Sequence, residues 1–373
     1  MIKVFQVSSD TNIGGAGKCI LTFLKEYDRS VFDMSVVLPK NSLLRDEILN
    51  LGVRVIEADG INETSLGRKG IASLKRIFRE ERPQIVHTHA SMSARVAAKL
   101  CGGCKIVYTR HSVFEPSPKI SKGLGKVING AVNNFLADRI IAVAEAAKKN
   151  LTDCGVNPNK IQVILNGIQP VLPMSEAEKA KVRKAYQVDP QQKVISILAR
   201  LTPVKGHADL ITAAGILRQR GRKPLVLIAG TGESESALRE QIQAEGLEDT
   251  VRLVGFVEDV RGIVNITDIS ANASFGTEAT SMALLEGMCL GKPAVVSDFG
   301  GNPGVIFPER NGLLFPARNP VAMADCLERL LTDREAYEQM SQGAKDIFQS
   351  TFTAKRYAEE IQQVYLDLIG GKQ

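Results

Sequence analysis

Short apolar runs alternate with amphipathic stretches from one end of the chain to the other. Runs such as 140–144 and 225–229 have the length of buried strands, and their alternation with helical stretches predicts parallel α/β sheets. In the first half the predicted strands are 3–8, 32–38, 54–57, 85–88, 105–109, 139–143 and 161–165. In the second half they are 194–198, 225–229, 251–254, 269–273, 294–297 and 312–315. The stretches between them, for example 70–81 and 208–218, predict helices.

The two strand series are separated by a segment without periodicity, residues 166–176, which contains Pro170 and Pro173. Such a segment is typical of a linker between domains. The chain of 373 residues is also two to three times as long as a common domain. We therefore predict two Rossmann-like α/β domains, residues 1–168 and 169–352, followed by a C-terminal helix within 353–373.

The net charge of +6 is divided unevenly between the two halves. Residues 1–170 hold 24 Lys and Arg against 15 Asp and Glu, giving +9, whereas the remainder holds 23 against 26, giving −3. Part of the excess lies in 68–82 and part in Lys119, Lys122 and Lys126. Apolar residues interleave with these lysines as in an interfacial helix: Ile120, Leu124, Val127 and Ile128. Solvated helix faces and attraction to an anionic membrane surface both account for this pattern.

Composition excludes several classes of protein. Hydrophobic residues make up 44% and charged residues 24%, which is ordinary for a folded globular chain. The mild basicity falls short of a dedicated nucleic-acid binder, and the absence of Trp argues against ligand binding by aromatic stacking. The start MIKVFQVSSD lacks the pattern of a signal peptide, no run approaches 18 apolar residues, and the cysteines fit reduced thiols. These features predict a cytoplasmic protein.

A glycine-rich turn, Gly14-Gly15-Ala16-Gly17-Lys18, follows the first predicted strand and opens a helix. The spacing fits neither a P-loop nor the dinucleotide fingerprint, which argues against an NAD-dependent dehydrogenase. Two interpretations remain: backbone amides that approach an anion at a helix N-terminus, or a plain tight turn.

Three histidines, His87, His89 and His111, lie at or just after predicted strand ends. The carboxyl ends of parallel strands line the ligand crevice in sheets of this kind. We favour His111 as a functional residue and interpret His87 as a packing residue. No acidic residue accompanies the histidines at metal-ligand spacing, so no metal site is predicted.

Two cations and a glycine follow neighbouring strands of the second half. Arg200 ends one predicted strand, Lys205 follows five residues later, and Gly230 ends the next strand. Fixed cations at the mouth of a sheet are suited to a diphosphate, and a glycine allows close backbone approach.

Two glutamates mark the most informative stretch. Glu278 precedes an apolar helix and Glu286 lies within it, among apolar residues where a solvated side chain would be out of place. The helix start near Ser281 offers free amides and the positive end of the helix dipole to a phosphate group. A carboxylate among apolar residues needs polar partners, and ribose hydroxyls would serve.

These motifs together resemble the retaining glycosyltransferases of family four. The resemblance runs in family order over nearly the whole chain: Gly14-Gly15, His87-Thr-His89, Thr109-Arg-His111, 141–147, Asn166-Gly167, Arg200 with Lys205-Gly206, Gly255, Glu278-x7-Glu286, Gly291-Lys-Pro293 and Gly300-Gly301. It implies a GT-B fold, in which two Rossmann-like domains face each other across a cleft and the closing helix crosses back to the first domain.

The resemblance also implies roles for individual residues. Arg200 and Lys205 would neutralise the donor diphosphate, Glu278 would contact hydroxyls of the transferred sugar, and His111 would lie beside that sugar; these four are the predicted catalytic residues. The predicted donor-binding residues are Gly15, Gly230, Ser281, Met282, Ala283 and Glu286.

The predicted reaction transfers a hexose-type sugar, with retention, from a nucleoside diphosphate donor, with UDP favoured. The acceptor would be a glycan or a lipid-linked glycan in bacterial cell-surface polysaccharide synthesis, reached from the cytoplasmic face of the membrane. The chain contains no Asp-x-Asp motif, so we expect Arg200, Lys205 and a helix N-terminus to replace the metal ion, with no cofactor. The alternatives are a sugar-nucleotide epimerase of the same fold and a non-catalytic sugar-nucleotide-binding protein.

Overall fold

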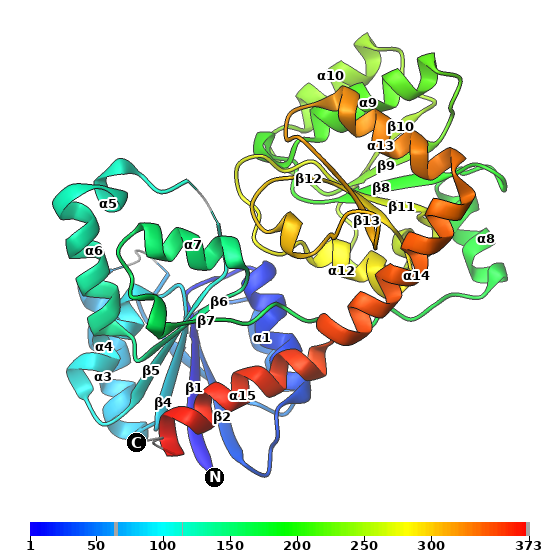
Figure 1. Cartoon of the computed structure of the whole chain (residues 1–373). Helices are drawn as coiled ribbons and strands as arrows, with labels where there is room; N and C mark the ends of the chain where they lie inside the picture. The colour runs from blue at the N-terminus through cyan, green and yellow to red at the C-terminus, as the bar shows by residue number, and fades with distance from the viewer. Residues whose placement is uncertain (63–65, 114, 371–373) are drawn as a thin grey trace. The chain divides into compact units, whose positions relative to one another are not determined.

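A computed structural model describes residues 1–62, 66–113 and 115–370. The chain folds into two compact units (Figure 1): Met1–Ile168 together with Ala354–Gln373, and Gln169–Thr353. Residues 371–373, the end of the predicted C-terminal helix, lie outside the described part.

The first unit is built on a seven-stranded sheet with the order β3-β2-β1-β4-β5-β6-β7. Every ladder in it is parallel. Its strands are β1 (Ile2–Ser8), β2 (Phe32–Pro39), β3 (Arg54–Ala58), β4 (Ile85–His89), β5 (Lys105–Arg110), β6 (Arg139–Ala142) and β7 (Ile161–Val163). Its helices are α1 (Gly15–Glu26), α2 (Leu44–Asn50), α3 (Arg68–Glu81), α4 (Met92–Cys101), α5 (Pro118–Ser121), α6 (Gly123–Leu136), α7 (Glu145–Asp153) and α15 (Ala354–Gly370).

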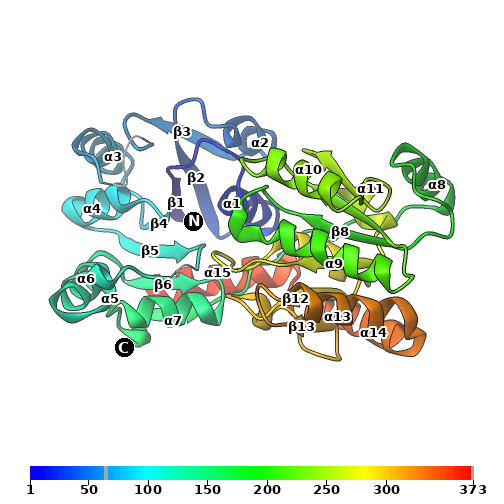
Figure 2. The same cartoon turned by 90° about the horizontal axis from the view of Figure 1, so that it is seen from above.

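Side chains alternate across this sheet, so each strand presents different residues to its two faces. Phe5, Val7 and Val86 face a core shared with α3 and α4. Figure 2 shows α3, α4 and α6 on one face of the sheet and α1 on the other. Gln6 and His87 therefore point to the opposite face from that core, where Tyr365 of α15 hydrogen-bonds His87.

The second unit contains a six-stranded parallel sheet with the order β10-β9-β8-β11-β12-β13. Its strands are β8 (Val194–Leu198), β9 (Leu225–Ala229), β10 (Val251–Gly255), β11 (Ile269–Asn272), β12 (Ala294–Ser297) and β13 (Gly312–Phe315). Its helices are α8 (Glu176–Ala185), α9 (His207–Gln219), α10 (Glu235–Ala244), α11 (Arg261–Ile266), α12 (Met282–Cys289), α13 (Pro320–Thr332) and α14 (Arg334–Thr351). Residues of α9, α10 and α13 pack against one face to form its main core.

The strand predictions are confirmed: each occurs in the structure, with ends within two residues of those expected. Continuous apolar runs identify these strands well because the strands of a parallel sheet covered by helices are buried on both faces. Residues 164–175 contain no regular element, as the two prolines lead us to expect. The backbone of Val171 in this segment contacts Cys289 of the second unit, N to Sγ, at 3.3 Å.

Candidate functional site

The carboxyl ends of three adjacent strands in the second sheet gather the predicted cations. β8 lies between β9 and β11, so the loops that follow these strands are neighbours. The Leu201 amide donates to the Thr231 carbonyl at 2.9 Å, and the Phe275 amide donates to the Val204 carbonyl at 2.9 Å. The loops carrying Arg200, Gly230 and Glu278 are thus joined by backbone hydrogen bonds.

Glu278 is held by an ion pair and two hydrogen bonds that all end on one carboxylate oxygen. Lys205 Nζ lies 2.9 Å from Oε2, Asn272 Nδ2 lies 3.0 Å from it, and the Ser274 hydroxyl lies 3.1 Å from it. The Glu278 side chain is 8% exposed and that of Lys205 is 15% exposed. Paired in this way, two charges can be buried without the full desolvation cost of an isolated ion.

A second layer of amides and hydroxyls fixes the residues that hold Glu278. Asn272 Oδ1 accepts from the Ser274 amide at 3.0 Å, while Asn302 Nδ2 lies 3.1 Å from both the carbonyl and the hydroxyl oxygen of Ser297. The Ser297 hydroxyl donates to the Ser274 carbonyl at 2.6 Å. Asn302 and Ser297 are fully buried. This network orients Asn272 and Ser274 before any ligand arrives.

Two glycines allow the loops to approach each other. Gly206 has φ +69°, and a Cβ there would lie 2.1 Å from the Ala273 carbonyl oxygen. Gly300 has φ +61°, and a Cβ there would lie 2.4 Å from the Glu278 carbonyl oxygen. Only glycine fits either position without displacing the backbone that carries Lys205 or Glu278.

Arg200 differs from Lys205 in its surroundings. Its side chain is exposed, and among the described residues no hydrogen bond or ion pair involves its guanidinium. It lies two residues after the end of β8, on the same connection as Lys205. An exposed cation at the mouth of the sheet is available to bind an anion.

The predicted phosphate-binding helix begins where the sequence indicates. Ser281 caps α12, so the amides of Met282 and Ala283 lie in the first turn, where no helical carbonyl precedes them. Glu286 lies one turn further along and is half-buried. Glu278 is joined to this region through its carbonyl, which accepts from the Gly301 amide at 3.0 Å. The structure thus places the glutamates of the E-x7-E motif on either side of one helix N-terminus.

In the first unit, His111 follows β5 and His89 ends β4, the adjacent strand. His89 Nδ1 lies 2.8 Å from His111 Nε2, and the rings are stacked with centroids 5.1 Å apart. Gly15 opens α1, is exposed, and has open space where a Cβ would stand. Among the described residues, no neighbouring atom would therefore exclude a larger side chain at position 15.

Burial keeps all three histidines neutral. It lowers the pKa of His111 to about 4 and, with a further effect of His111, that of His87 to about 3. Burial and the neighbouring histidines hold the pKa of His89 well below its usual value. His87 is fully buried between Tyr365 and Thr109, each with an oxygen 2.6 Å from a ring nitrogen. This is the packing role expected for His87, although its hydrogen bonds are specific.

Residues 1–62, 66–113 and 115–370 contain no group of three or more His, Cys, Asp or Glu side chains placed to hold a metal ion. No helix in these ranges combines the length and apolarity needed to cross a bilayer.

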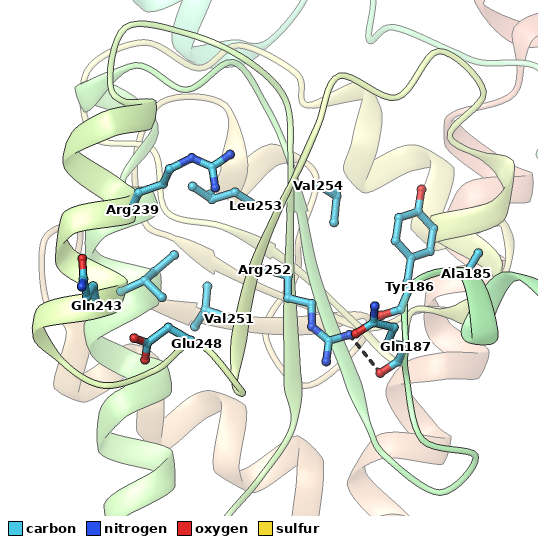
Figure 3. Close-up of a pocket in the computed structure, with 11 residues that line it drawn as sticks. Ala185, Tyr186, Gln187, Arg239, Gln243, Glu248, Val251, Arg252, Leu253 and Val254 are labelled. Carbon is cyan, nitrogen blue, oxygen red and sulfur yellow. Dashed lines mark hydrogen bonds between the residues drawn. The ribbon is translucent and has the colours of Figure 1, made fainter.

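The second unit also has a groove of about 490 Å³ along its edge strand β10 (Figure 3). Arg239, Glu248 and Arg252 line it, and Arg252 donates to the backbone carbonyl of Gln187 at 2.9 Å. None of the predicted site residues lines this groove. Its mixed charges, partly engaged by the chain itself, do not indicate a particular ligand.

Several residues with clear structural roles were not predicted from the sequence. Asn272 and Ser274 contact Glu278, and Gln6 contacts His89 at 3.1 Å. Tyr365 contacts His87 from a helix 278 positions away in sequence. Asn272 could have been recognised as a polar residue at the end of a buried strand; Tyr365 carries no comparable signal.

Comparison with known proteins extends over nearly the whole chain. Residues 13–172 match the model described as Glycosyltransferase Family 4, and residues 178–347 match the model described as Glycosyl transferases group 1. The chain is 25% identical to an Escherichia coli UDP-Gal:alpha-D-GlcNAc-diphosphoundecaprenol alpha-1,3-galactosyltransferase, covering 100% of this chain and 98% of the relative. It is 30% identical to the amylovoran biosynthesis glycosyltransferase AmsK of Erwinia amylovora, covering 59% of this chain and 51% of the relative.

A solved structure shares the fold. The chain resembles HepE of Anabaena in complex with UDP and glucose with a TM-score of 0.84 and 21% identity, over 98% of this chain and 99% of the other. Because the two family models each match one of the two parallel α/β units, and the structural likeness spans both, the chain belongs to the family-four glycosyltransferases and has the GT-B fold.

Proposed function

We propose that this glycosyltransferase moves a hexose-type sugar from a UDP-sugar to a lipid-linked or glycan acceptor in bacterial cell-surface polysaccharide synthesis, with retention at the anomeric carbon and without a metal ion. The site for the donor is formed by the loops after β8, β9 and β11 and by the first turn of α12.

The observation that carries the proposal is the asymmetric environment of the Glu278 carboxylate. Three donors converge on Oε2, whereas Oε1 has no hydrogen-bond partner among the described residues. An ionised carboxylate accepts several hydrogen bonds, so Oε1 retains its capacity. A sugar hydroxyl donating to Oε1 would meet an acceptor already fixed in orientation, which favours catalysis by positioning.

The diphosphate is matched by cations rather than by acidic metal ligands. The Lys205 ammonium has three N–H groups; one donates to Glu278 and one to the Thr277 carbonyl at 3.1 Å. The third is left for a phosphate oxygen, with Arg200 and the amides of Met282 and Ala283 as further donors. Glu286 is the proposed ribose contact.

In the proposed reaction the bond between the anomeric carbon and the diphosphate oxygen breaks while the acceptor hydroxyl attacks from the same face. The hydroxyl proton passes to the departing phosphate oxygen, and UDP leaves with the electron pair of the broken bond. Lys205 and Arg200 stabilise the negative charge that develops on the phosphate as the bond breaks. His111 would lie beside the donor sugar, and Gly15 and Gly230 would allow close backbone approach.

The choice of substrates is supported by what the relatives are named for. One acts from UDP-Gal on a diphosphoundecaprenol-linked sugar, one serves amylovoran biosynthesis, and HepE binds UDP and glucose. The acceptor of the first of these relatives is a sugar linked to a lipid diphosphate, so we propose that the chain works at the cytoplasmic face of the plasma membrane.

An exposed apolar stripe on α6 supports contact with that membrane. The stripe consists of Leu124, Val127, Ile128, Val132 and Phe135, with Leu124 exposed to 74% and Phe135 to 64%. Lys119 and Lys122 flank its start and are exposed, and the unit that carries it has the net positive charge. Apolar side chains beside lysines suit the interface of an anionic bilayer.

The donor is tested first by thermal shift with UDP-, GDP-, ADP- and dTDP-sugars, since a ligand that binds only the folded state raises Tm. We expect UDP-sugars to give the largest shift. A larger increase in Tm with a GDP-, ADP- or dTDP-sugar would indicate that the donor carries that nucleotide and not UDP.

Transfer is tested with a radiolabelled UDP-hexose and a diphosphoundecaprenol-linked acceptor in EDTA. We expect labelled lipid-linked product with retained configuration. Isomerised donor without acceptor would indicate an epimerase instead, donor binding without turnover a non-catalytic protein, and loss of transfer in EDTA a metal-dependent enzyme.

Membrane contact is tested by co-sedimentation with phosphatidylglycerol and phosphatidylcholine vesicles at low ionic strength. We expect binding to the anionic vesicles only, weakened by the double substitution Leu124→Ser and Phe135→Ser. Leu172→Ser, at a residue 65% exposed in the second unit, is the matched control.

A further inference from the structure

The histidines of the first unit belong to a hydrogen-bonded chain that begins on α15 and ends at His111. Gln6 on β1 is paired in register with His87 on β4, and both face Tyr365, which is fully buried. Tyr365 bonds His87 Nδ1 at 2.6 Å, Gln6 Oε1 lies 3.1 Å from His89 Nε2, and His89 Nδ1 lies 2.8 Å from His111 Nε2.

The chemistry of these groups fixes the direction of each bond. Gln6 Oε1, and not the amide nitrogen, lies 3.1 Å from His89 Nε2. The Gln6 side chain also hydrogen-bonds Tyr365, which lowers the pKa of that phenol against the larger raising effect of burial. An amide oxygen can only accept a hydrogen bond, so His89 Nε2 carries the proton.

A neutral imidazole carries one N–H, and this settles the rest of the chain. With its proton on Nε2, His89 presents a lone pair at Nδ1, so His111 must donate from Nε2. His111 Nδ1 is then an acceptor without a proton. It is buried and has no hydrogen-bond partner among the described residues, which is unusual for a buried polar atom.

We infer that Gln6, His89 and Tyr365 are positioning residues that hold His111 as its Nε2–H tautomer, so that Nδ1 presents a lone pair to a hydroxyl group of the bound substrate. This rests on the proposed function for the identity of the substrate. A lone pair attracts a hydroxyl donor and repels an unprotonated phosphate oxygen, so His111 recognises the sugar and not the diphosphate. The opposite tautomer would donate from Nδ1 and would lose this distinction.

The tautomer is measured by ¹⁵N NMR of the imidazoles in the full-length chain without ligand. The chain has only four histidines, so single substitutions assign the signals. We expect His89 and His111 to carry their protons on Nε2. A proton on Nδ1 of His111 in the wild-type chain would overturn the inference.

Gln6→Leu removes both ends of the central amide and is expected to give mixed tautomers at His111, with turnover lowered by about tenfold, the equivalent of one hydrogen bond. Thr109→Val is the matched control, because the Thr109 hydroxyl bonds the Nε2 side of His87, at 2.6 Å, and no side chain of the His89–His111 pair within the described residues. It should leave the His111 tautomer unchanged. An unaltered tautomer in a folded Gln6→Leu chain would refute the positioning role.

If Gln6→Leu does not fold, Tyr365→Phe gives the same comparison, since it removes the hydroxyl that orients the Gln6 amide. The tautomer is read without donor or acceptor, so its outcome is separate from that of the transfer assay. A chain with the expected tautomer and no transfer would contradict the proposed function alone.

Discussion

The carboxyl ends of the two sheets hold polar side chains in different ways. In the first unit, neutral imidazoles, an amide and a phenol form a hydrogen-bonded chain, and burial keeps the pKa of each histidine low. In the second, the ion pair of Lys205 and Glu278 is surrounded by amides and hydroxyls. Under the proposed function the two units have different roles: fixed charge suits a diphosphate and its developing charge, whereas uncharged acceptors suit hydroxyl groups.

The largest expected effect concerns acid stability. A histidine whose folded pKa lies below its usual value favours folding fully above about pH 6.5, and this contribution is lost as the pH falls toward the folded pKa. The pKa values of His87 and His111 are about 3 and 4, so each residue should lower the free energy of unfolding by about 2 kcal/mol between pH 7 and pH 5. His89 acts in the same direction.

The second unit contains one histidine with a similar shift, His207, whose pKa burial lowers to about 4. We therefore expect amide hydrogen exchange in β4 and β5 to accelerate more than in β8 and β9 when the pH is lowered from 7 to 5, after correction for intrinsic rates. Equal acceleration in both sheets would contradict the contrast between the two units.

Removing either charge of the Lys205–Glu278 ion pair should abolish most of the transfer activity. Lys205→Ala and Glu278→Gln are each expected to lower turnover by about 10²-fold, because each takes away a charged contact made in the reaction. Lys193→Ala, which breaks an exposed ion pair of 3.0 Å to Asp268, is the matched control and should be nearly silent. Near-normal turnover of both site variants would mean that the ion pair is not part of the donor site.

Gly300→Ala tests whether the loop beneath Glu278 must be a glycine. Its Cβ would collide with the Glu278 carbonyl, whereas Gly246 has nearly the same φ, +63°, with open space around it. Both substitutions carry the strain of positive φ, and the collision should cost Gly300→Ala about 1–3 kcal/mol more in unfolding free energy. Urea denaturation of the two variants measures this difference; equal costs would show that the loop accommodates the methyl group.

The smallest effect is expected at Arg200. Since the side chain is exposed, Arg200→Ala should leave stability unchanged while lowering kcat/KM for the donor by about tenfold, the equivalent of about 1.4 kcal/mol. The loss should shrink as salt is added, because salt already screens an exposed charge. A salt-independent loss, or a lowered melting temperature, would indicate a structural role instead.

Much of the fold could be predicted from the sequence because parallel strands covered on both faces appear as continuous apolar runs. The predicted strand 139–143 and the observed β6, Arg139–Ala142, differ by a single residue. The ends of the predicted strands also indicated Arg200, Lys205 and His111 as candidate site residues. In each sheet, the carboxyl ends of the parallel strands line the ligand crevice.

The contacts that orient those residues could not be predicted. The bond from Gln6 to His89 depends on the register of β1 against β4, and the bond from Tyr365 to His87 spans 278 positions. Ile120, included in the predicted membrane-facing pattern, is only half-exposed, whereas Val132 and Phe135 of the same helical region are exposed. The other three predicted residues, Leu124, Val127 and Ile128, are exposed, so helical spacing indicated most of the stripe but not where it ends.

The most direct test of the account is the transfer of labelled hexose from UDP-hexose to a diphosphoundecaprenol-linked acceptor in EDTA, comparing the wild-type chain with Glu278→Gln. We expect wild-type product with retained configuration and a rate about 10²-fold lower in the variant. Equal rates in the two chains, or transfer that requires a divalent ion, would contradict it.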